Sequence, residues 1–420
     1  MGRLALFDRD TWQEIFGTIR KHKLRTGLTA LGVFWGIFML IFVLGMGAGL
    51  KNGVYRQFGD RAKNVLYVWP SRTTLPYEGF RSGRVPRLTR DDIDILKNNI
   101  DDIDGIAPRL SLNNRIARVN DKTEEVEIRG EYEDMIRLEA LRVYDGRYIN
   151  RADREQSRKV AVIGDRTREL LFGDESGIGE YVMLDGMAFR VVGVFGPEQI
   201  ESWTESDLEA IVIPLTTMYR AFGTGERVEY FVCSAAPRVR VSEVENKVIR
   251  LLKERHHIAP GDPRGIGSNN LEEEFQSIQN LFGGITAFLW FVGIGTLLAG
   301  IVGVSNIMLI VVKERTREIG LRKAMGATPQ SIISMILTES IFITSISGYL
   351  GLLLSTLIIG GIDALLISQG AEFENFHHPE VDLEVGVGAV VLLVMAGTVA
   401  GLIPALQAAR VNPVQALKDE

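Results

Sequence analysis

Four membrane-length stretches without charged side chains constrain the fold of this chain more than any other feature. They cover residues 28–50, 281–312, 332–362 and 385–409, and Glu339 is the single charged residue inside them. A helix rises about 1.5 Å per residue, so roughly 20 residues cross about 30 Å of hydrocarbon. We therefore expect an α-helical membrane protein with four transmembrane helices, although 46% hydrophobic and 24% charged residues would suit a soluble protein.

Basic residues beside these stretches predict the orientation of the chain. Before the first stretch stand Arg20, Lys21, Lys23 and Arg25. The segment Lys313–Thr328, after the second stretch, carries five Lys or Arg and two Glu. Short loops rich in basic residues stay on the cytoplasmic side. We expect cytoplasmic ends at 1–27 and 410–420, an exported region at 51–280, a cytoplasmic loop at 313–331 and a short outer loop at 363–384.

The first stretch is too long for a cleavable signal peptide and lacks a cleavage site after it, so it is expected to be an uncleaved signal anchor. Glu339 lies near the cytoplasmic end of the long third stretch. We favour a carboxylate that is hydrated at the lipid headgroups. The alternative is a buried proton-relay carboxylate, since charges deep in a membrane are usually functional.

The exported region is long enough for one large or two small domains. Apolar runs with β-branched residues predict strands at 64–69, 126–129, 159–164, 181–184, 189–195, 210–214 and 228–234. Helices are predicted from Thr89, where Asp92 completes a capping box, and over 166–172 and 241–255. This mixture predicts an extracytoplasmic α+β domain.

Helical periodicity continues outward from both junctions between the exported region and the membrane. The apolar positions are Leu50, Val54 and Phe58 after the first span, and Leu271, Phe275, Ile278 and Phe282 before the second. Steps of three and four residues are typical of a coiled-coil seam. We expect a paired helical stalk that bears the exported domain. The alternative is two separate amphipathic helices folded into that domain.

Small side chains recur at every fourth position within the membrane stretches. The stripes are Gly32 and Gly36; Gly295, Ala299 and Gly303; Ser347, Gly351 and Ser355; and Gly397, Gly401 and Ala405. Such stripes let helix backbones approach closely in lipid. The pattern predicts packing faces, either within this chain or against another one.

Little in the sequence favours catalysis or nucleic-acid binding. The net charge is -6, and the basic residues cluster near the membrane. Cys233 is the single cysteine, in a strand-like run that predicts a buried small hydrophobe. His377 and His378 are adjacent rather than spaced as metal ligands on one helix face, and the acidic DDID repeats lack EF-hand spacing. We expect no catalytic residues and no metal site.

Six segments carry a resemblance to a known family. The run GIVGVSNIMLIVVKERTREIGLRKAMGAT, from Gly300 to Thr328, closely resembles MacB-type and FtsX-like ABC transporter permeases. The ending GLIPALQAARVNPVQAL and the N-terminal KHKLRTGLTALGVFWG resemble the same family, and KVAVIG, LFG and FRVVGVFGP resemble its periplasmic core domain. The resemblance implies a MacB periplasmic core-like domain, with a second subdomain inserted at about residues 146–225.

The resemblance also implies a role in transmitting mechanical work. No GxxxxGK(S/T) motif occurs in the sequence, so ATP and Mg are expected on a separate ABC ATPase and not on this chain. The further partners implied are a second permease chain, identical or different, a periplasmic adaptor, an outer-membrane channel and membrane lipid. The ATPase-coupling residues implied are Glu314, Arg315, Arg317, Glu318, Ile319, Leu321, Arg322, Lys323, Met325 and Gly326. The alternative for this loop is a solvated, topology-setting segment.

The function we expect is that of a permease subunit of an export or efflux system in a bacterial inner membrane. One alternative within the family is a lipoprotein-releasing or FtsX-like regulatory complex, although division-type FtsX proteins usually have a smaller exported domain. An alternative from another class is a membrane-anchored periplasmic enzyme or sensor.

Overall fold

The computed structural model describes residues 23–58, 64–197, 204–369, 376–381 and 383–412. It forms two compact units, which are described separately. One comprises the chain up to Arg56 and from Leu281 onward, and the other comprises Gln57–Asn280. Of the cytoplasmic ends predicted at 1–27 and 410–420, residues 1–22 and 413–420 lie outside the described residues, as do residues 370–375 and 382 of the predicted outer loop.

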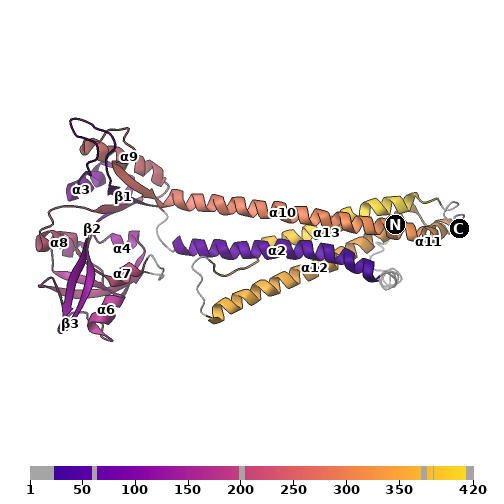
Figure 1. The fold of residues 1–420 in the computed structure, drawn as a ribbon, viewed down its shortest axis with the longest axis horizontal. Coiled ribbons are helices and arrows are strands. Elements are labelled where there is room, and N and C mark those ends of the chain that lie inside the picture. The colour runs from indigo at the N-terminus through magenta and orange to yellow at the C-terminus, as the bar shows by residue number, and fades with distance from the viewer. Residues whose placement is uncertain (1–22, 59–63, 198–203, 370–375, 382, 413–420) are drawn as a thin grey trace. The chain divides into compact units, whose positions relative to one another are not determined.

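The first unit is helical. Its elements are α2 (Lys23–Phe58), α10 (Leu271–Glu314), α11 (Thr316–Ala324), α12 (Pro329–Gln369) and α13 (Leu383–Arg410), of which residues 57–58 of α2 and 271–280 of α10 belong to the second unit (Figure 1). Within the described residues, four helical segments are long and apolar enough to cross a membrane: 30–55, 271–314, 329–368 and 385–410. The expected four-helix membrane architecture is confirmed.

Small residues bring the membrane helices into close contact. A Cβ at Gly36 of α2 would lie 3.6 Å from the Cα of Leu297 in α10, and one at Gly351 of α12 would lie 2.7 Å from the carbonyl oxygen of Phe34. On α13, a Cβ at Gly397 would meet the Cα of Ile341 at 3.2 Å, and the hydroxyl of Ser340 donates to the Gly397 carbonyl at 3.1 Å. These contacts surround an apolar core that includes Ile37, Leu393 and Ala400.

The stripe Gly295, Ala299 and Gly303 does not form such a contact within this chain. All three residues are exposed, and a Cβ at Gly295 or Gly303 would meet nothing within 4 Å. The close approach of α2 falls instead on Leu297 and Gly300. A packing role for the stripe inside the chain is therefore wrong, whereas Gly397 and Gly401 do pack against α12.

The second unit is built on one mixed sheet (Figure 1). Its strands are β1 (Val65–Pro70), β2 (Ile103–Val119), β3 (Lys122–Glu131), β4 (Leu141–Gly146), β5 (Val160–Gly164), β6 (Tyr181–Leu184), β7 (Met187–Pro197), β8 (Ala210–Pro214), β9 (Tyr230–Ala235) and β10 (Ile266–Asn270). The order is β10-β1-β9-β2-β3-β8-β5-β7-β4, and β6 pairs with β2 and β7. The β3–β8 and β5–β7 pairs are parallel and the others are antiparallel.

The helices of this unit are α3 (Arg90–Asn99), α4 (Met135–Leu138), α5 (Arg151–Glu155), α6 (Asp165–Phe172), α7 (Glu205–Glu209), α8 (Leu215–Phe222) and α9 (Val241–Arg255). The predicted start at Thr89 is confirmed, because its backbone N–H donates to the Asp92 carboxylate at 2.7 Å. Each predicted strand overlaps an observed one. The sequence did not predict β2, β4 and β10.

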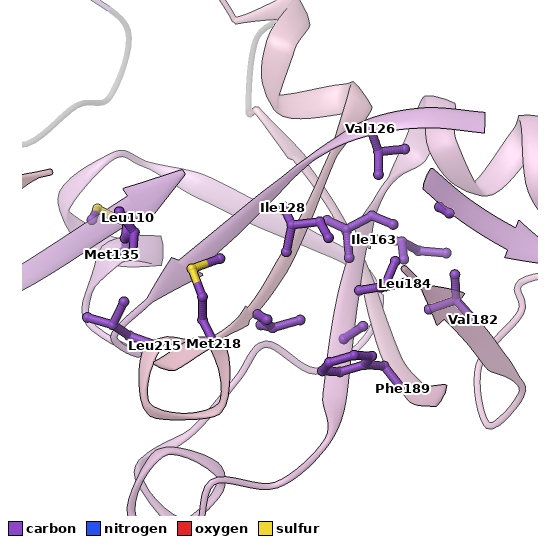
Figure 2. Packing of buried hydrophobic residues seen from close by; sticks show 14 of the residues in the cluster. Leu110, Val126, Ile128, Met135, Ile163, Val182, Leu184, Phe189, Leu215 and Met218 are labelled. Carbon is purple, nitrogen blue, oxygen red and sulfur yellow. The ribbon is translucent and has the colours of Figure 1, made fainter. Parts of the chain in front are cut away.

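Side chains alternate between two apolar clusters on opposite faces of the central strands. The larger cluster gathers Ile128, Ile163, Phe189 and their neighbours (Figure 2). The other packs β1 and β9 against α3 and α9, and it contains Cys233. Burial raises the pKa of the Cys233 thiol to about 12, as suits the predicted buried hydrophobe.

The strands at the β4 end enclose a further cluster around Tyr148, Val162 and Phe195. The resemblance placed an inserted subdomain at about 146–225. In the structure β4 begins before that point and pairs with β7, while β8 joins these strands to β3. The segment thus continues the main sheet.

Asp262 fixes the loop that follows β1. Its carboxylate accepts backbone N–H groups of Thr74 at 2.7 Å, Leu75 at 2.9 Å and Arg264 at 3.0 Å. Burial by itself would raise the pKa of Asp262, but these donors outweigh it and hold the pKa well below its ordinary value. The charged carboxylate is therefore the form that stabilises the loop.

Filling the contact at Gly397 should separate α12 from α13. Gly397→Val would press a branched side chain against the backbone of Ile341 and should cost about 1–3 kcal/mol. The thermal unfolding midpoint of the purified chain should fall. Gly303→Val is the matched control and should leave the midpoint unchanged, because open space surrounds Gly303. Equal midpoints for the two variants would show that this contact is not tight.

The second unit should lose stability in acid through Asp262. A lowered folded-state pKa gives a contribution that is complete above the ordinary carboxyl pKa near 4 and is lost as pH falls below it. Asp262→Asn should cost about 1–3 kcal/mol at pH 7, and the cost should shrink toward pH 3. Urea unfolding followed by tryptophan fluorescence measures both values. Asp121→Asn, at an exposed hairpin position, should change neither.

Candidate coupling site

The short helix α11 connects α10 to α12. Arg315 separates it from α10, and the hydroxyl of Thr316 donates to the carbonyls of Val312 at 3.1 Å and Lys313 at 2.7 Å. At its end the N–H of Met325 donates to Leu321, and Gly326 then takes φ +100°. That backbone conformation favours glycine, so Gly326 allows the chain to turn toward α12.

One face of α11 is fixed to the membrane helices. Ile319 is 2% exposed and belongs to the same core as Ile332 and Ala408. The Lys323 ammonium donates to the carbonyls of Ala409 at 2.8 Å and Val411 at 2.7 Å, at the C-terminal end of α13. Ala409 lies in the last turn of α13 and Val411 just beyond it, so Lys323 both caps α13 and ties α11 to it.

Charged side chains join α11 to α12. Glu318 pairs with Arg322 at 2.9 Å and with Arg315 at 3.2 Å, and Arg315 reaches Glu339 at 3.4 Å. Glu339 is 5% exposed. Our favoured interpretation of a hydrated carboxylate is therefore wrong, because the guanidinium of Arg315 compensates its charge inside the helical unit.

The opposite face of α11 is exposed. Leu321 is 50% exposed and Met325 is 73% exposed, and Glu314 and Arg317 are also exposed. Ile319 and Met325 therefore do not share one apolar face, because Ile319 is packed in the core. The sequence indicates this division. Residues 315, 319 and 323 are four positions apart and lie on one face of the helix, and residues 317, 321 and 325 lie on the other face.

The proposed stalk positions fall in both units. Leu271 and Phe282 are buried and Phe275 and Ile278 are half-buried, whereas the residues between them are exposed apart from the half-buried Glu272. Phe282 makes an edge-on contact with Tyr55 of α2, with ring centroids 6.0 Å apart. Val54 is half-buried and Leu50 is 42% exposed, while the Phe58 side chain lies outside the described residues. Pairing along the whole seam stays a prediction.

The described residues contain no group of three or more His, Cys, Asp or Glu placed to hold a metal ion. The rings of His377 and His378 lie 4.1 Å apart, and His378 Nδ1 is 3.0 Å from an Asp363 carboxylate oxygen. The N–H of His377 donates to the Gly49 carbonyl at 3.0 Å. These contacts attach the described part of the outer loop to α2 and α12.

Two family models match this chain. Residues 26–251 match a MacB-like periplasmic core domain, and residues 290–413 match an FtsX-like permease C-terminal region. The first match includes most of the second unit, and the second match includes α11 and the two helices after it.

Similar proteins cover nearly the whole chain. The macrolide export ATP-binding/permease protein MacB of Bdellovibrio bacteriovorus is 30% identical over 414 residues, which are 96% of this chain and 61% of that protein. The pyoverdine export ATP-binding/permease protein PvdT of Pseudomonas entomophila is 30% identical over 401 residues, or 95% and 58%. The chain thus spans about three fifths of the length of these relatives.

Among solved structures, the periplasmic region of MacB from Actinobacillus actinomycetemcomitans matches with a TM-score of 0.43 and 21% identity. The match covers 52% of this chain and 93% of that one. Together, the two family models and the chain-long similarity show that this protein belongs to the MacB-like family of ABC transporter permeases, with a MacB-like periplasmic core domain and an FtsX-like permease domain.

Proposed function

We propose that this chain is the permease subunit of an exporter that couples ATP hydrolysis by a separate ATPase to movement of its exported domain. The observation that carries the proposal is the division of α11 into an anchored face and an exposed face. Leu321 and Met325 present apolar surface beside charged residues, an arrangement that suits a protein interface.

The anchored face explains how force would pass from α11 to the membrane helices. Ile319 is packed in the helical core, Lys323 holds the end of α13, and Arg315 reaches Glu339 in α12. Packed helices move as bodies rather than yield locally, because their interiors are close-packed. A partner that displaces α11 would therefore displace α12 and α13 with it.

The orientation we propose places α11 in the cytoplasm and the second unit in the periplasm of a bacterial cell. The relatives' names join ATP-binding and permease functions, whereas GxxxxGK(S/T) is absent from these 420 residues. We therefore assign ATP and Mg to an ATPase partner and no enzymatic activity to this chain. Both names also specify export, which favours export over lipoprotein release. A second permease chain, a periplasmic adaptor and an outer-membrane channel complete the proposed assembly.

Met325→Asp should separate docking from folding. The side chain is 73% exposed in this chain, so the variant should insert into the membrane and unfold like the parent. An unpaired carboxylate buried in the partner contact would cost roughly 3–5 kcal/mol, which is more than 100-fold in affinity. Co-purification of the ATPase and transport-dependent resistance should both be lost.

Met325→Leu is the matched control for this experiment, because it keeps an apolar side chain of similar volume. It should retain ATPase binding and transport. Full ATPase recovery with Met325→Asp would mean that the loop only sets topology. Loss of membrane insertion in that variant would instead show that Met325 is needed by the chain itself.

A second experiment tests the stalk. Cysteines at Val54 and Phe275, in a Cys233→Ala background, should form a disulfide if the seam pairs, since Cα atoms must lie within about 7 Å. The yield should change with the nucleotide bound to the ATPase. Val54 paired with a cysteine at the exposed Glu273, off the seam, is the control and should stay reduced. Equal yields from the two pairs would indicate two independent helices.

A further inference from the structure

A cavity of about 690 Å³ opens on the exported unit where β1, β9 and β10 meet the connection between α4 and β4. Its lining includes three aromatic residues, Tyr67, Trp69 and Tyr230, and two carboxylates, Glu139 and Glu229. Cavities of roughly 300–1,000 Å³ with apolar walls and a few polar groups are typical of small-molecule sites.

The aromatic residues form one wall of the cavity. Tyr67 and Trp69 alternate along β1 and so share a face of the sheet, and Tyr230 of β9 lies with its ring centroid 6.3 Å from that of Tyr67. Trp69 is 39% exposed although it lies in the sheet. Its ring covers Gly267 of β10, where a Cβ would come within 2.5 Å of it. The absence of a side chain at Gly267 therefore lets the indole lie along β10.

The carboxylates next to this wall outnumber the guanidinium groups that pair with them. Arg109 is 5% exposed and is held by Glu131 at 2.6 Å, by Glu139 and by the Tyr230 hydroxyl at 2.5 Å. The guanidinium of Arg109 thus pairs with two buried carboxylates. Its neighbour Arg129 likewise pairs with two carboxylates, Glu127 and Asp207.

Both lining carboxylates are positioned by the protein. Glu139 is 8% exposed, and Arg109 contacts one of its oxygens. Glu229 accepts the backbone N–H of Ser111 at 2.9 Å through one oxygen and is itself exposed. Arg227 is the basic residue of the lining, and it is also exposed. The lining therefore places two carboxylates, one of them buried, and one guanidinium next to aromatic rings.

We propose that this cavity binds an amphipathic organic cation, with its apolar ring system against Tyr67 and Trp69 and its positive group beside Glu139 and Glu229. Aromatic faces attract cations as well as apolar surface, and a carboxylate next to them adds a charged hydrogen bond. The ligand's role as cargo of the exporter rests on the proposed function. Its binding does not, because every group involved belongs to the exported unit.

The test is a titration of the full chain, without ATPase, in nanodiscs of zwitterionic lipid. The probe is the cationic dye rhodamine 6G, followed by fluorescence anisotropy, with empty nanodiscs subtracted. Glu229→Gln and Trp69→Ala should each weaken binding tenfold or more. Trp69→Phe should keep most of it. The anionic xanthene dye fluorescein should not bind.

Glu175→Gln is the matched control, because it removes an exposed carboxylate outside the cavity and should leave the affinity unchanged. Equal affinity in all variants would overturn the proposal by showing partition into lipid only. Equal weakening by Glu229→Gln and Glu175→Gln would also overturn the proposal, by showing that the dye binds through the general negative charge of the surface. Since no ATPase is present, failure here leaves the Met325→Asp result unaffected, and the reverse also holds.

Discussion

Close approach of helix backbones at small residues is the constraint on which the membrane unit depends. In lipid, apolar side chains gain little by leaving their solvent, so packing and hydrogen bonds hold the helices together. The contacts at Gly36, Gly351 and Gly397 join α2, α10, α12 and α13 into one body. Because these helices form one body, Ile319 and Lys323 of α11 contact a surface whose parts are fixed relative to one another. Under the proposed function, a partner bound to the exposed face of α11 would act on the whole body, because the other face of α11 is packed against it.

The length of an apolar stretch and the alternation of apolar residues follow directly from burial. The sequence could therefore predict the four spans, the α+β class and most strands. Other elements were not predicted, for identifiable physical reasons. In β2 the alternation is broken by Pro108, by the buried Arg109 and by the Asn113–Asn114 pair, whereas β10 is mostly polar. From sequence alone, an arginine is expected at the surface unless its partners are known. The partners of Arg109 are Glu131 and Glu139, which lie outside β2.

Helix α11 shows the same division between local and tertiary information. Its position and charge could be predicted from the sequence, and the steps of four indicate its two faces. The partners of Lys323 could not be predicted, because Ala409 and Val411 are more than eighty positions away. Glu339 is the clearest example, because the guanidinium of Arg315 lies beside it in the folded unit. The cavity beside Trp69 was not predicted, since its walls come from separated segments.

The junction between β10 and α10 has a mechanical consequence. Asn270 ends the strand and Leu271 begins the helix, so no flexible residue separates them. β10 is hydrogen-bonded to β1 through five consecutive residue pairs, from Leu66–Asn270 to Pro70–Ile266. A pull that arrives along β10 loads all of these pairs together, in shear, instead of opening them one after another. The strand can therefore carry tension into the sheet without peeling away from it.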